Sequence, residues 1–248
     1  MRIYTGTSGF AYKEWKGHFY PEKISPKELL RFYASRLNTV EINNTFYHMP
    51  NGTVLTSWAD QVGRDFVFAL KAPQVITHMK RLRHVSSETG YLFKSLSVLE
   101  GKLGPVLFQF PASFHADRTV LQEFLDLIPR AALCAFEFRS PSWLDDGTLD
   151  LLREKKCSLC IADADDAPAG EIISTAPWGY LRLRRSDYTD DDLSRWAEKV
   201  LEQKWEKAYV FFKHEGEGAK GPELAMRFQG LVDSRGEEIK TAGMRKAG

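Results

Sequence analysis

The sequence predicts a single-domain α/β protein folded as a (β/α)8 TIM barrel, and three observations indicate this class. Eight short apolar runs rich in Val, Ile, Leu, Phe and Tyr recur along the chain, as expected for buried strands. Helical patterns separate most of these runs, and such alternation is typical of parallel strands. The chain has 248 residues, and at this length closure of eight strand–helix units into one barrel is the economical arrangement.

The eight predicted strands are short segments, and most are followed by a helical pattern. The strands are predicted at residues 2–8, 39–44, 66–71, 105–110, 133–139, 158–163, 179–184 and 208–214. The helices are predicted at residues 24–37, 52–62, 86–104, 118–128, 144–156, 189–205 and 221–232. Ser25 is expected to cap the first helix with Pro26 at its first position, and Asp117 and Thr189 to begin two later helices.

One connection departs from the alternation. Between the sixth and seventh strands, residues 164–177 contain prolines and poor helical periodicity, which predicts an irregular crossover. A doubly wound open sheet is the alternative architecture, but its first turn should carry a G-x-G-x-x-G fingerprint, and Gly6-Thr-Ser-Gly9 is not one. No linker divides the chain, so residues 1–248 are predicted to form one domain, with 233–248 a polar, partly frayed tail.

The composition excludes several classes of protein. The 34 Lys and Arg residues balance 33 Asp and Glu, so the formal charge of +1 gives no overall attraction to nucleic acid or to an anionic membrane. A chain with 43% hydrophobic and 27% charged residues is an ordinary globular protein. No apolar run approaches the ~20 residues of a membrane span. The N-terminus lacks the layout of a signal peptide. We therefore expect a cytoplasmic protein without a membrane partner.

The three cysteines, Cys134, Cys157 and Cys160, are too few and odd in number for a disulfide framework, so we expect reduced thiols. Cys157 and Cys160 have the spacing of a redox or metal motif. They lie in an apolar segment without a second pair, which favours two small buried side chains.

Polar side chains at the C-terminal ends of the predicted strands are the informative feature of the sequence. In a parallel barrel these ends form the mouth, where active sites lie. The polar set comprises Glu41, Asn43, Lys71, Gln109, Glu137, Arg139, Asp163, Arg182, Arg184, Lys213 and His214. A purely structural lumen would be filled by Val, Ile and Leu, so the set as a whole predicts a functional site. For any single residue the alternative is a structural ion pair, for example Glu137 with Arg182.

The predicted mouth also contains more cations than carboxylates. The cations are Lys71, Arg139, Arg182, Arg184 and Lys213, and the carboxylates are Glu41, Glu137 and Asp163. Two arginines on one strand face present planar groups that suit phosphate or carboxylate, which predicts an anionic ligand. The three carboxylates are the candidate catalytic residues, with Glu137 or Glu41 as general base.

Four motifs in the chain resemble those of the DUF72 (YecE-like) family. They are GTSGFAYKEWKGHFYP at 6–21, TVEINNTFY at 39–47, FQFP at 108–111 and FEFRSPSW at 136–143. The resemblance covers at least residues 1–215 and implies a TIM barrel, in agreement with the strand pattern. It implies no reaction, because the family is functionally uncharacterised.

Position by position, the resemblance implies a set of ligand-binding residues. It adds Ser8, Tyr12, Trp15, Asn44, Tyr47 and Trp143 to Glu41, Asn43, Lys71, Gln109, Glu137, Arg139 and Arg182. Two segments depart from the family pattern. Arg184-Arg185 stands where many members have His-Gly, and Lys213-His214 stands where many have Asn-Asn. Both departures add cationic or titratable groups at the mouth.

The leading functional hypothesis is an enzyme, a candidate hydrolase, acting on a phosphorylated or other anionic small molecule. A metal-dependent hydrolase or isomerase would use Glu41, Glu137, Asp163 and His214 as ligands; no cofactor is predicted, and a divalent metal stays open. A glycosidase would pair two carboxylates with Trp15, Trp58 and Trp143 around a sugar. The non-enzyme hypothesis is single-stranded nucleic-acid binding through the basic segment His78–His84, for which a solvated loop is the simpler interpretation.

Overall fold

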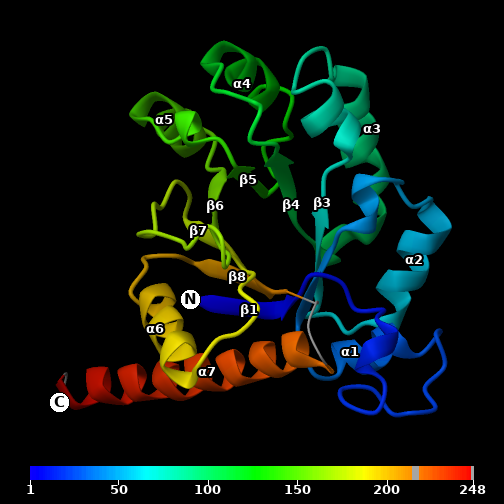
Figure 1. Ribbon diagram of the computed structural model, residues 1–248, viewed down its shortest axis with the longest axis vertical. Coiled ribbons are helices and arrows are strands. Elements are labelled where there is room, and N and C mark those ends of the chain that lie inside the picture. Colours follow the sequence, from blue (N-terminus) through cyan, green and yellow to red (C-terminus); the bar gives the residue numbers. More distant parts are fainter. Residues whose placement is uncertain (214–217, 247–248) are drawn as a thin grey trace.

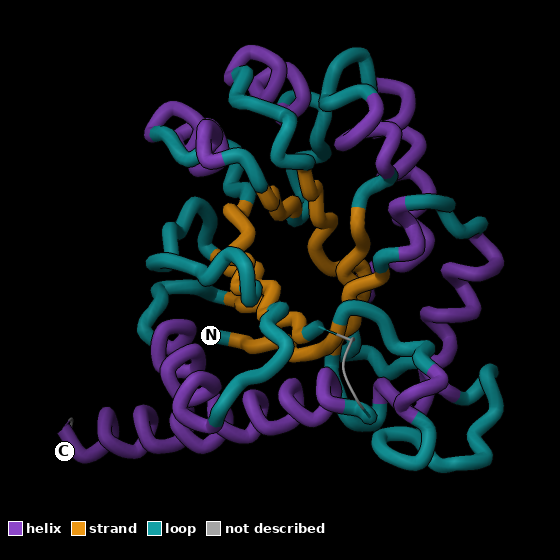
Figure 2. Tube along the Cα trace, viewed as in Figure 1, coloured by secondary structure: helices purple, strands orange, loops and turns teal. Residues whose placement is uncertain are grey.

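The computed structural model describes residues 1–213 and 218–246. Eight parallel strands form a nearly closed barrel, with helices on its outside (Figures 1 and 2). The strands are β1 (Arg2–Thr7), β2 (Thr39–Ile42), β3 (Val67–Lys71), β4 (Leu103–Phe110), β5 (Cys134–Phe138), β6 (Ser158–Asp163), β7 (Trp178–Leu183) and β8 (Lys207–Phe212). From β2 to β8 each strand pairs with the next one in the chain, and β8 also pairs with β1, so the remaining seam lies between β1 and β2. The predicted fold class is therefore confirmed.

The seam between β1 and β2 is closed mainly by side chains. A single isolated bridge, Ser8 to Glu41, joins the strand ends. Below it, the buried Tyr33 hydroxyl accepts from the Thr7 amide at 2.8 Å and lies 3.0 Å from the Thr39 carbonyl, to which it donates. The Asn38 side chain spans the same seam, since it accepts from the Thr5 amide and donates to the Ile3 carbonyl. These bonds replace a main-chain ladder.

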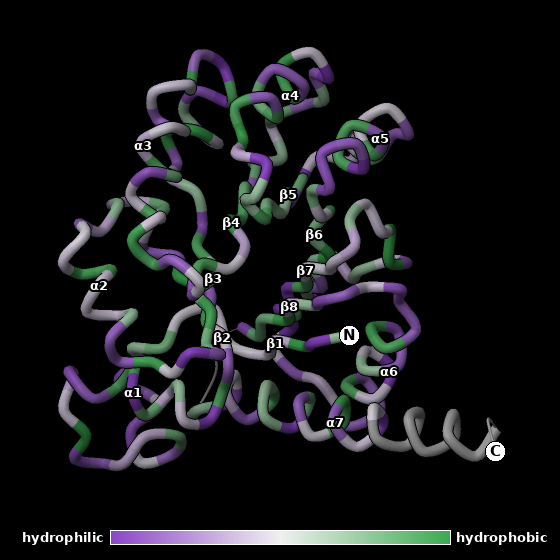
Figure 3. The backbone as a smooth tube through the Cα atoms, turned by 180° about the vertical axis from the view of Figure 1, so that it is seen from behind, coloured by the Kyte–Doolittle hydropathy of each residue, from purple (hydrophilic) through white to green (hydrophobic). Residues whose placement is uncertain are grey.

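The outer layer contains seven helices in the part of the chain that the structure describes. They are α1 (Leu29–Ala34), α2 (Gly52–Gln61), α3 (Ser86–Leu96), α4 (Arg118–Leu125), α5 (Asp146–Glu154), α6 (Asp190–Leu201) and α7 (Lys220–Lys246). Helices α4 and α5 alternate between hydrophilic and hydrophobic residues (Figure 3), as expected when one face of a helix packs on a sheet. The predicted caps are confirmed at Asp117, which accepts from the Val120 amide, and at Thr189, which forms a capping box with Asp192.

The predicted start of the first helix is wrong. The helix α1 begins at Leu29 and not after Ser25, because residues 26–28 form a turn. In this turn the Glu28 amide donates to the Ser25 carbonyl, and the Ser25 amide donates to the Glu28 carboxylate. Ser25 thus closes a turn and does not cap the helix.

The last helix is longer than the sequence indicates. The helix α7 continues to Lys246, through most of the segment 233–248 expected to be a frayed tail. Arg235 explains part of this extension, because its guanidinium donates to the Ser194 carbonyl and lies 2.9 Å from a Glu198 carboxylate oxygen on α6. The irregular crossover is confirmed, since residues 164–177 contain no helix.

The barrel has two separate hydrophobic regions. The outer one lies between the strands and the helices and includes Phe68, Phe108 and Phe136. The inner one fills the N-terminal half of the lumen with aromatic rings: Tyr4 and Tyr209 stack at 4.8 Å, and Trp178 meets Tyr209 edge-on at 5.9 Å. All three cysteines are buried and free, and Cys157 and Cys160 belong to different regions, as two small hydrophobic side chains would.

Candidate functional site

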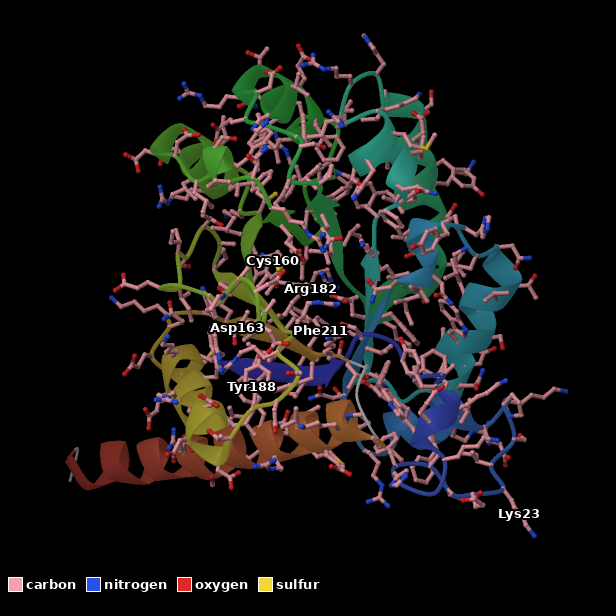
Figure 4. All side chains as sticks on the ribbon, viewed as in Figure 1. Lys23, Cys160, Asp163, Arg182, Tyr188 and Phe211 are labelled. Carbon is pink, nitrogen blue, oxygen red and sulfur yellow. The ribbon has the colours of Figure 1, made fainter. Side chains whose placement is uncertain are left out.

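Three charged side chains form a buried triad in the C-terminal half of the lumen. Glu41 from β2, Glu137 from β5 and Arg182 from β7 are 0%, 5% and 2% exposed. One terminal nitrogen of Arg182 lies 2.9 Å from Glu41 Oε1, and the other lies 2.6 Å from Glu137 Oε2. Arg182, labelled in Figure 4, therefore bridges two carboxylates inside the barrel.

Glu41 is fully enclosed by donors. Its Oε1 accepts from Ser8 Oγ and Asn43 Nδ2, both at 2.9 Å, as well as from Arg182, and its Oε2 accepts from the Tyr180 hydroxyl at 2.8 Å. Burial alone would raise the pKa of Glu41, but the charge of Arg182 and these hydrogen bonds outweigh it and lower the pKa to about 2. Such a carboxylate holds its neighbours in place and is a poor proton acceptor.

Glu137 differs from Glu41 because it lies next to the mouth. Its Oε1 accepts from Gln109 Nε2 at 2.6 Å, and the Arg139 Nε lies 3.6 Å from the same oxygen. Burial acts to raise the pKa of Glu137, but Arg182 and Gln109 reverse the effect and lower it. Arg139 is 57% exposed in its side chain, so this edge of the triad reaches solvent.

A polar chain connects Glu137 to a lysine. The amide of Gln109 donates to Glu137, while its Oε1 accepts from Lys71 Nζ at 2.6 Å. The ammonium of Lys71 also lies over the ring of Phe46, 4.1 Å from the centroid. Burial lowers the pKa of Lys71 to about 8, and the nearby charge of Arg182 acts in the same direction.

Sequence reasoning missed two residues at this position, Phe46 and His78. Phe46 follows β2 and packs its ring against His78, with the centroids 4.9 Å apart, so one ring contacts both His78 and Lys71. Burial and the charge of Lys71 lower the pKa of His78. Phe46 is part of the family-like TVEINNTFY motif, which was the available signal. His78 was assigned only to the basic segment His78–His84, because no pattern in the sequence connects it to β2.

The remaining predicted cations belong to β7 and β8. Arg184 continues the face of Tyr180 and Arg182, and Lys213 continues the face of Tyr209 and Phe211, which both line the lumen. Arg184 and Lys213 are both partly buried. His214, the last predicted ligand-binding residue, lies outside the described residues.

Asp163 belongs to a different cluster from the triad. Its strand parity places it with Leu159 and Ile161 on the outer face of β6. Its carboxylate accepts from Arg185 Nε and the Tyr188 hydroxyl, both at 2.9 Å, and from the Ala169 amide at 3.0 Å. This cluster anchors the irregular crossover, and its contacts with loop residues account for the burial of Asp163.

The residues implied by the family resemblance divide into two groups. Ser8 and Asn43 contact Glu41, and Tyr12 donates through its hydroxyl to the Ser8 carbonyl. Asn44 and Tyr47 are exposed. Trp15 and Trp143 are 1% and 0% exposed, and Trp143 stacks on Phe138 and donates to the Phe114 carbonyl. Packing within the protein accounts for both tryptophans.

The cations of the basic segment His78–His84 have partners within the protein. Lys80 pairs with Glu88, and Arg83 pairs with Asp117 at 2.7 Å. Arg81 donates to the carbonyl and the hydroxyl of Ser113. The segment is thus tied to α3 and to the loop before α4.

The triad does not have the arrangement of a metal site. Arg182 already supplies the positive charge between Glu41 and Glu137, at hydrogen-bonding distance from each. Among the side chains described, those of residues 1–213 and 218–236, no three His, Cys, Asp or Glu gather as metal ligands would. A metal ion would have to displace the guanidinium, so no step of the chemistry is assigned to one.

A cavity of about 780 Å³ lies at the opposite end of the barrel. It is lined by residues from the start of β1, including Arg2 and Ile3, and by Trp205 and Val232. In TIM barrels this N-terminal face serves stability, whereas active sites lie at the C-terminal face. The candidate site is therefore the charged mouth and not this cavity. Among the described helices, none has both the length and the hydropathy that crossing a membrane requires.

Comparisons with known proteins agree with this architecture. A DUF72 protein from Thermotoga maritima superposes with a TM-score of 0.82 at 25% identity, over 94% of this chain and all of that one. A DUF72 protein from Enterococcus faecalis gives a TM-score of 0.77 at 20% identity, over 93% and 95% of the two chains. The protein YecE of Escherichia coli (strain K12) is 33% identical over 119 residues, which are 48% of this chain and 44% of YecE. The family model described as "Protein of unknown function DUF72" matches residues 4–247, and the chain belongs to this family.

Proposed function

We propose that the barrel mouth is the active site of an enzyme that binds a phosphorylated or other anionic small molecule. One observation carries the proposal: the two inward carboxylates already share Arg182, and two further cations lie beside Glu137, Lys71 through Gln109 and Arg139 at 3.6 Å. Five inward strand positions are cationic against two that are anionic, so an approaching anion meets a positive field. The field attracts the anion, and the Arg139 guanidinium can then donate hydrogen bonds to it.

The geometry narrows the catalytic roles that the carboxylates can take. Glu41 is enclosed and its pKa is low, so its role is to fix Arg182, Asn43 and Ser8. Glu137 lies nearer to the mouth and stays ionised through Arg182. Glu137 is therefore the better candidate base, and hydrolysis, with Glu137 activating water, stays a prediction.

Binding of inorganic phosphate tests the proposal. Isothermal titration calorimetry should show phosphate binding to the wild type, weakened about fivefold or more in Arg139→Gln, because the charged contact is lost. Lys23→Gln is the matched control, since Lys23 is an exposed cation at the outer edge of the molecule (Figure 4). Equal affinity of the wild type and Arg139→Gln, or no binding by either, would overturn the proposal.

Single-stranded nucleic-acid binding is the alternative that the same protein can test. The exposed cations Lys80, Arg81 and Arg83 would then contact phosphates, at the cost of their present partners. Fluorescence anisotropy with a single-stranded oligonucleotide should show no salt-dependent binding under our proposal. Binding that disappears in the triple variant K80Q/R81Q/R83Q would favour the alternative.

A further inference from the structure

Lys71 has an environment unlike that of the surface lysines. It ends β3 with its side chain partly buried at the mouth. Its ammonium is held by the Gln109 amide oxygen at 2.6 Å and by the face of Phe46. Within the described parts of the chain it forms no salt bridge, because its nearest polar partner is a neutral amide and Glu137 lies behind that amide.

Burial favours the neutral amine of Lys71 more than solvent does, although the amide oxygen and the aromatic face act in the other direction. Burial and the charge of Arg182 lower the pKa of Lys71 to about 8, against the opposing charges of Glu137 and Glu41. At pH 7 roughly one tenth of the Lys71 side chains are then free amines, compared with fewer than one in a thousand for an ordinary lysine. A free amine is the nucleophilic form, and a desolvated lysine beside another cation is a known way of obtaining it.

We propose that Lys71 forms an imine with the carbonyl carbon of an anionic aldehyde or ketone at the mouth, an inference that rests on the proposed function. The ammonium first releases a proton, and the amine nitrogen then attacks the carbonyl carbon. The carbonyl π pair moves to oxygen, which takes a proton from nitrogen to give a carbinolamine. The C–O bond then breaks, and the hydroxyl leaves as water with the proton that the ammonium released. A protonated C=N bond and one water result, so no oxidant or reductant is needed.

The surrounding groups fit both ends of such a substrate. Arg139 lies on β5, separated from Lys71 by β4 alone, and it can bind the phosphate or carboxylate while the carbonyl faces Lys71. His78 contacts the same Phe46 ring as Lys71, and its lowered pKa favours the neutral imidazole, which can accept the released proton. The substrate class is therefore a small carbonyl compound with one anionic group.

Reductive trapping tests the inference. The full chain is incubated at pH 8 with glycolaldehyde phosphate and cyanoborohydride, and adducts are located by peptide mass mapping. We expect Lys71 to be modified at least tenfold faster than exposed Lys23, with a rate that rises to half its maximum near pH 8. Uncharged glycolaldehyde, which lacks the phosphate that Arg139 would bind, should modify Lys71 several-fold more slowly than glycolaldehyde phosphate does. Modification of Lys71 no faster than Lys23, or equal rates of Lys71 modification by the two aldehydes, would overturn the inference.

Two variants separate this inference from the proposed function. Lys71→Arg keeps a positive charge at this position but cannot form an imine, so the dominant adduct should be lost. Lys23→Arg should keep the Lys71 adduct. Phosphate binding by the wild type without selective trapping would refute the imine and leave the anion site standing. Absence of phosphate binding would refute the proposed function itself. Peptide mapping of adducts on the wild-type protein requires no substitution, so it tests the inference even if Lys71→Arg folds poorly.

Discussion

The two halves of the barrel lumen are filled in different ways. The N-terminal half contains stacked aromatic rings, with Tyr4, Trp178 and Tyr209 in direct contact. The C-terminal half contains Glu41, Glu137 and Arg182, all almost completely buried. The same eight strands line both halves, so closing the barrel does not require charges. Because burying ions costs several kcal/mol each unless they are paired, the difference supports our proposal that the charged half binds an anionic ligand.

Removing the shared cation should have the largest effect. In Arg182→Met, two buried carboxylates lose their common partner, and we expect the free energy of unfolding to fall by about 3–5 kcal/mol at pH 7. Urea denaturation followed by circular dichroism measures it. The triple variant E41Q/E137Q/R182M should recover much of the loss, because it buries no unpaired charge. If the free energy of unfolding of Arg182→Met is within about 1 kcal/mol of the wild-type value, Arg182 does not stabilise the two carboxylates as described.

In the aromatic half, removing a whole ring should lower the free energy of unfolding by a comparable amount. Removing a polar group there should have little effect. Tyr209→Ala removes a ring that contacts both Tyr4 and Trp178, and should lower stability by about 3 kcal/mol through the cavity it leaves. Tyr209→Phe keeps the ring and should stay within about 1 kcal/mol. The same urea titrations provide the comparison, and phosphate affinity should be unchanged in Tyr209→Phe. A larger loss in the Phe variant than in the Ala variant would exclude packing as the cause.

Low pH should reduce the stability that the charged half of the lumen contributes, but not the stability that the aromatic half contributes. The pKa of Glu41 is about 2 in the folded protein and near 4.5 when the chain is unfolded, so the unfolded state binds protons first as the pH falls. The stability that Glu41 provides is complete above about pH 5 and decreases as the pH falls toward 2, by about 2 kcal/mol at pH 3. Thermal unfolding at pH 6 and pH 3 should show a smaller acid loss in Glu41→Gln than in the wild type. If both proteins lose the same stability between pH 6 and pH 3, protonation of Glu41 is not the cause of the loss.

The smallest effect on stability is expected at the rim. Arg139 is more than half exposed and lies 3.6 Å from Glu137, so Arg139→Gln should change the free energy of unfolding by at most about 0.5 kcal/mol. Its phosphate affinity should fall as described above. Loss of stability equal to that of Arg182→Met would place Arg139 in the structural triad and not in the binding surface.

Strand parity explains how much of the site the sequence could predict. Glu41, Glu137 and Arg182 share the inward face of their strands, and Glu137 pairs with Arg182, as the structural alternative for these residues had it. The same parity rule places Asp163 with Leu159 and Ile161, on the opposite face from Cys160, so its separate environment was readable in principle. The eight strands were predictable because buried parallel strands are continuous apolar runs.

Loop residues could not be placed by the same reasoning. The contact of His78 with Phe46 joins the segments after β3 and β2, and no periodicity specifies how two loops meet. The burial of Trp143 depends on Phe114, in the loop between β4 and α4, and on Phe138, at the end of β5. The start of α1 was misjudged because the Ser-Pro pair suits a turn as well as a helix cap. The anionic ligand and the cytoplasmic location stay predictions.

The seam between β1 and β2 has a consequence for the order in which the protein is made. The main-chain ladder of β1 is with β8, the last strand to leave the ribosome, whereas its link to β2 depends on Tyr33 and Asn38 side chains. Since domains acquire structure as they are synthesised, β1 has to wait without its strand partner until nearly the whole chain has emerged. The strand pairing of β1 is thus completed only after β8 has been synthesised.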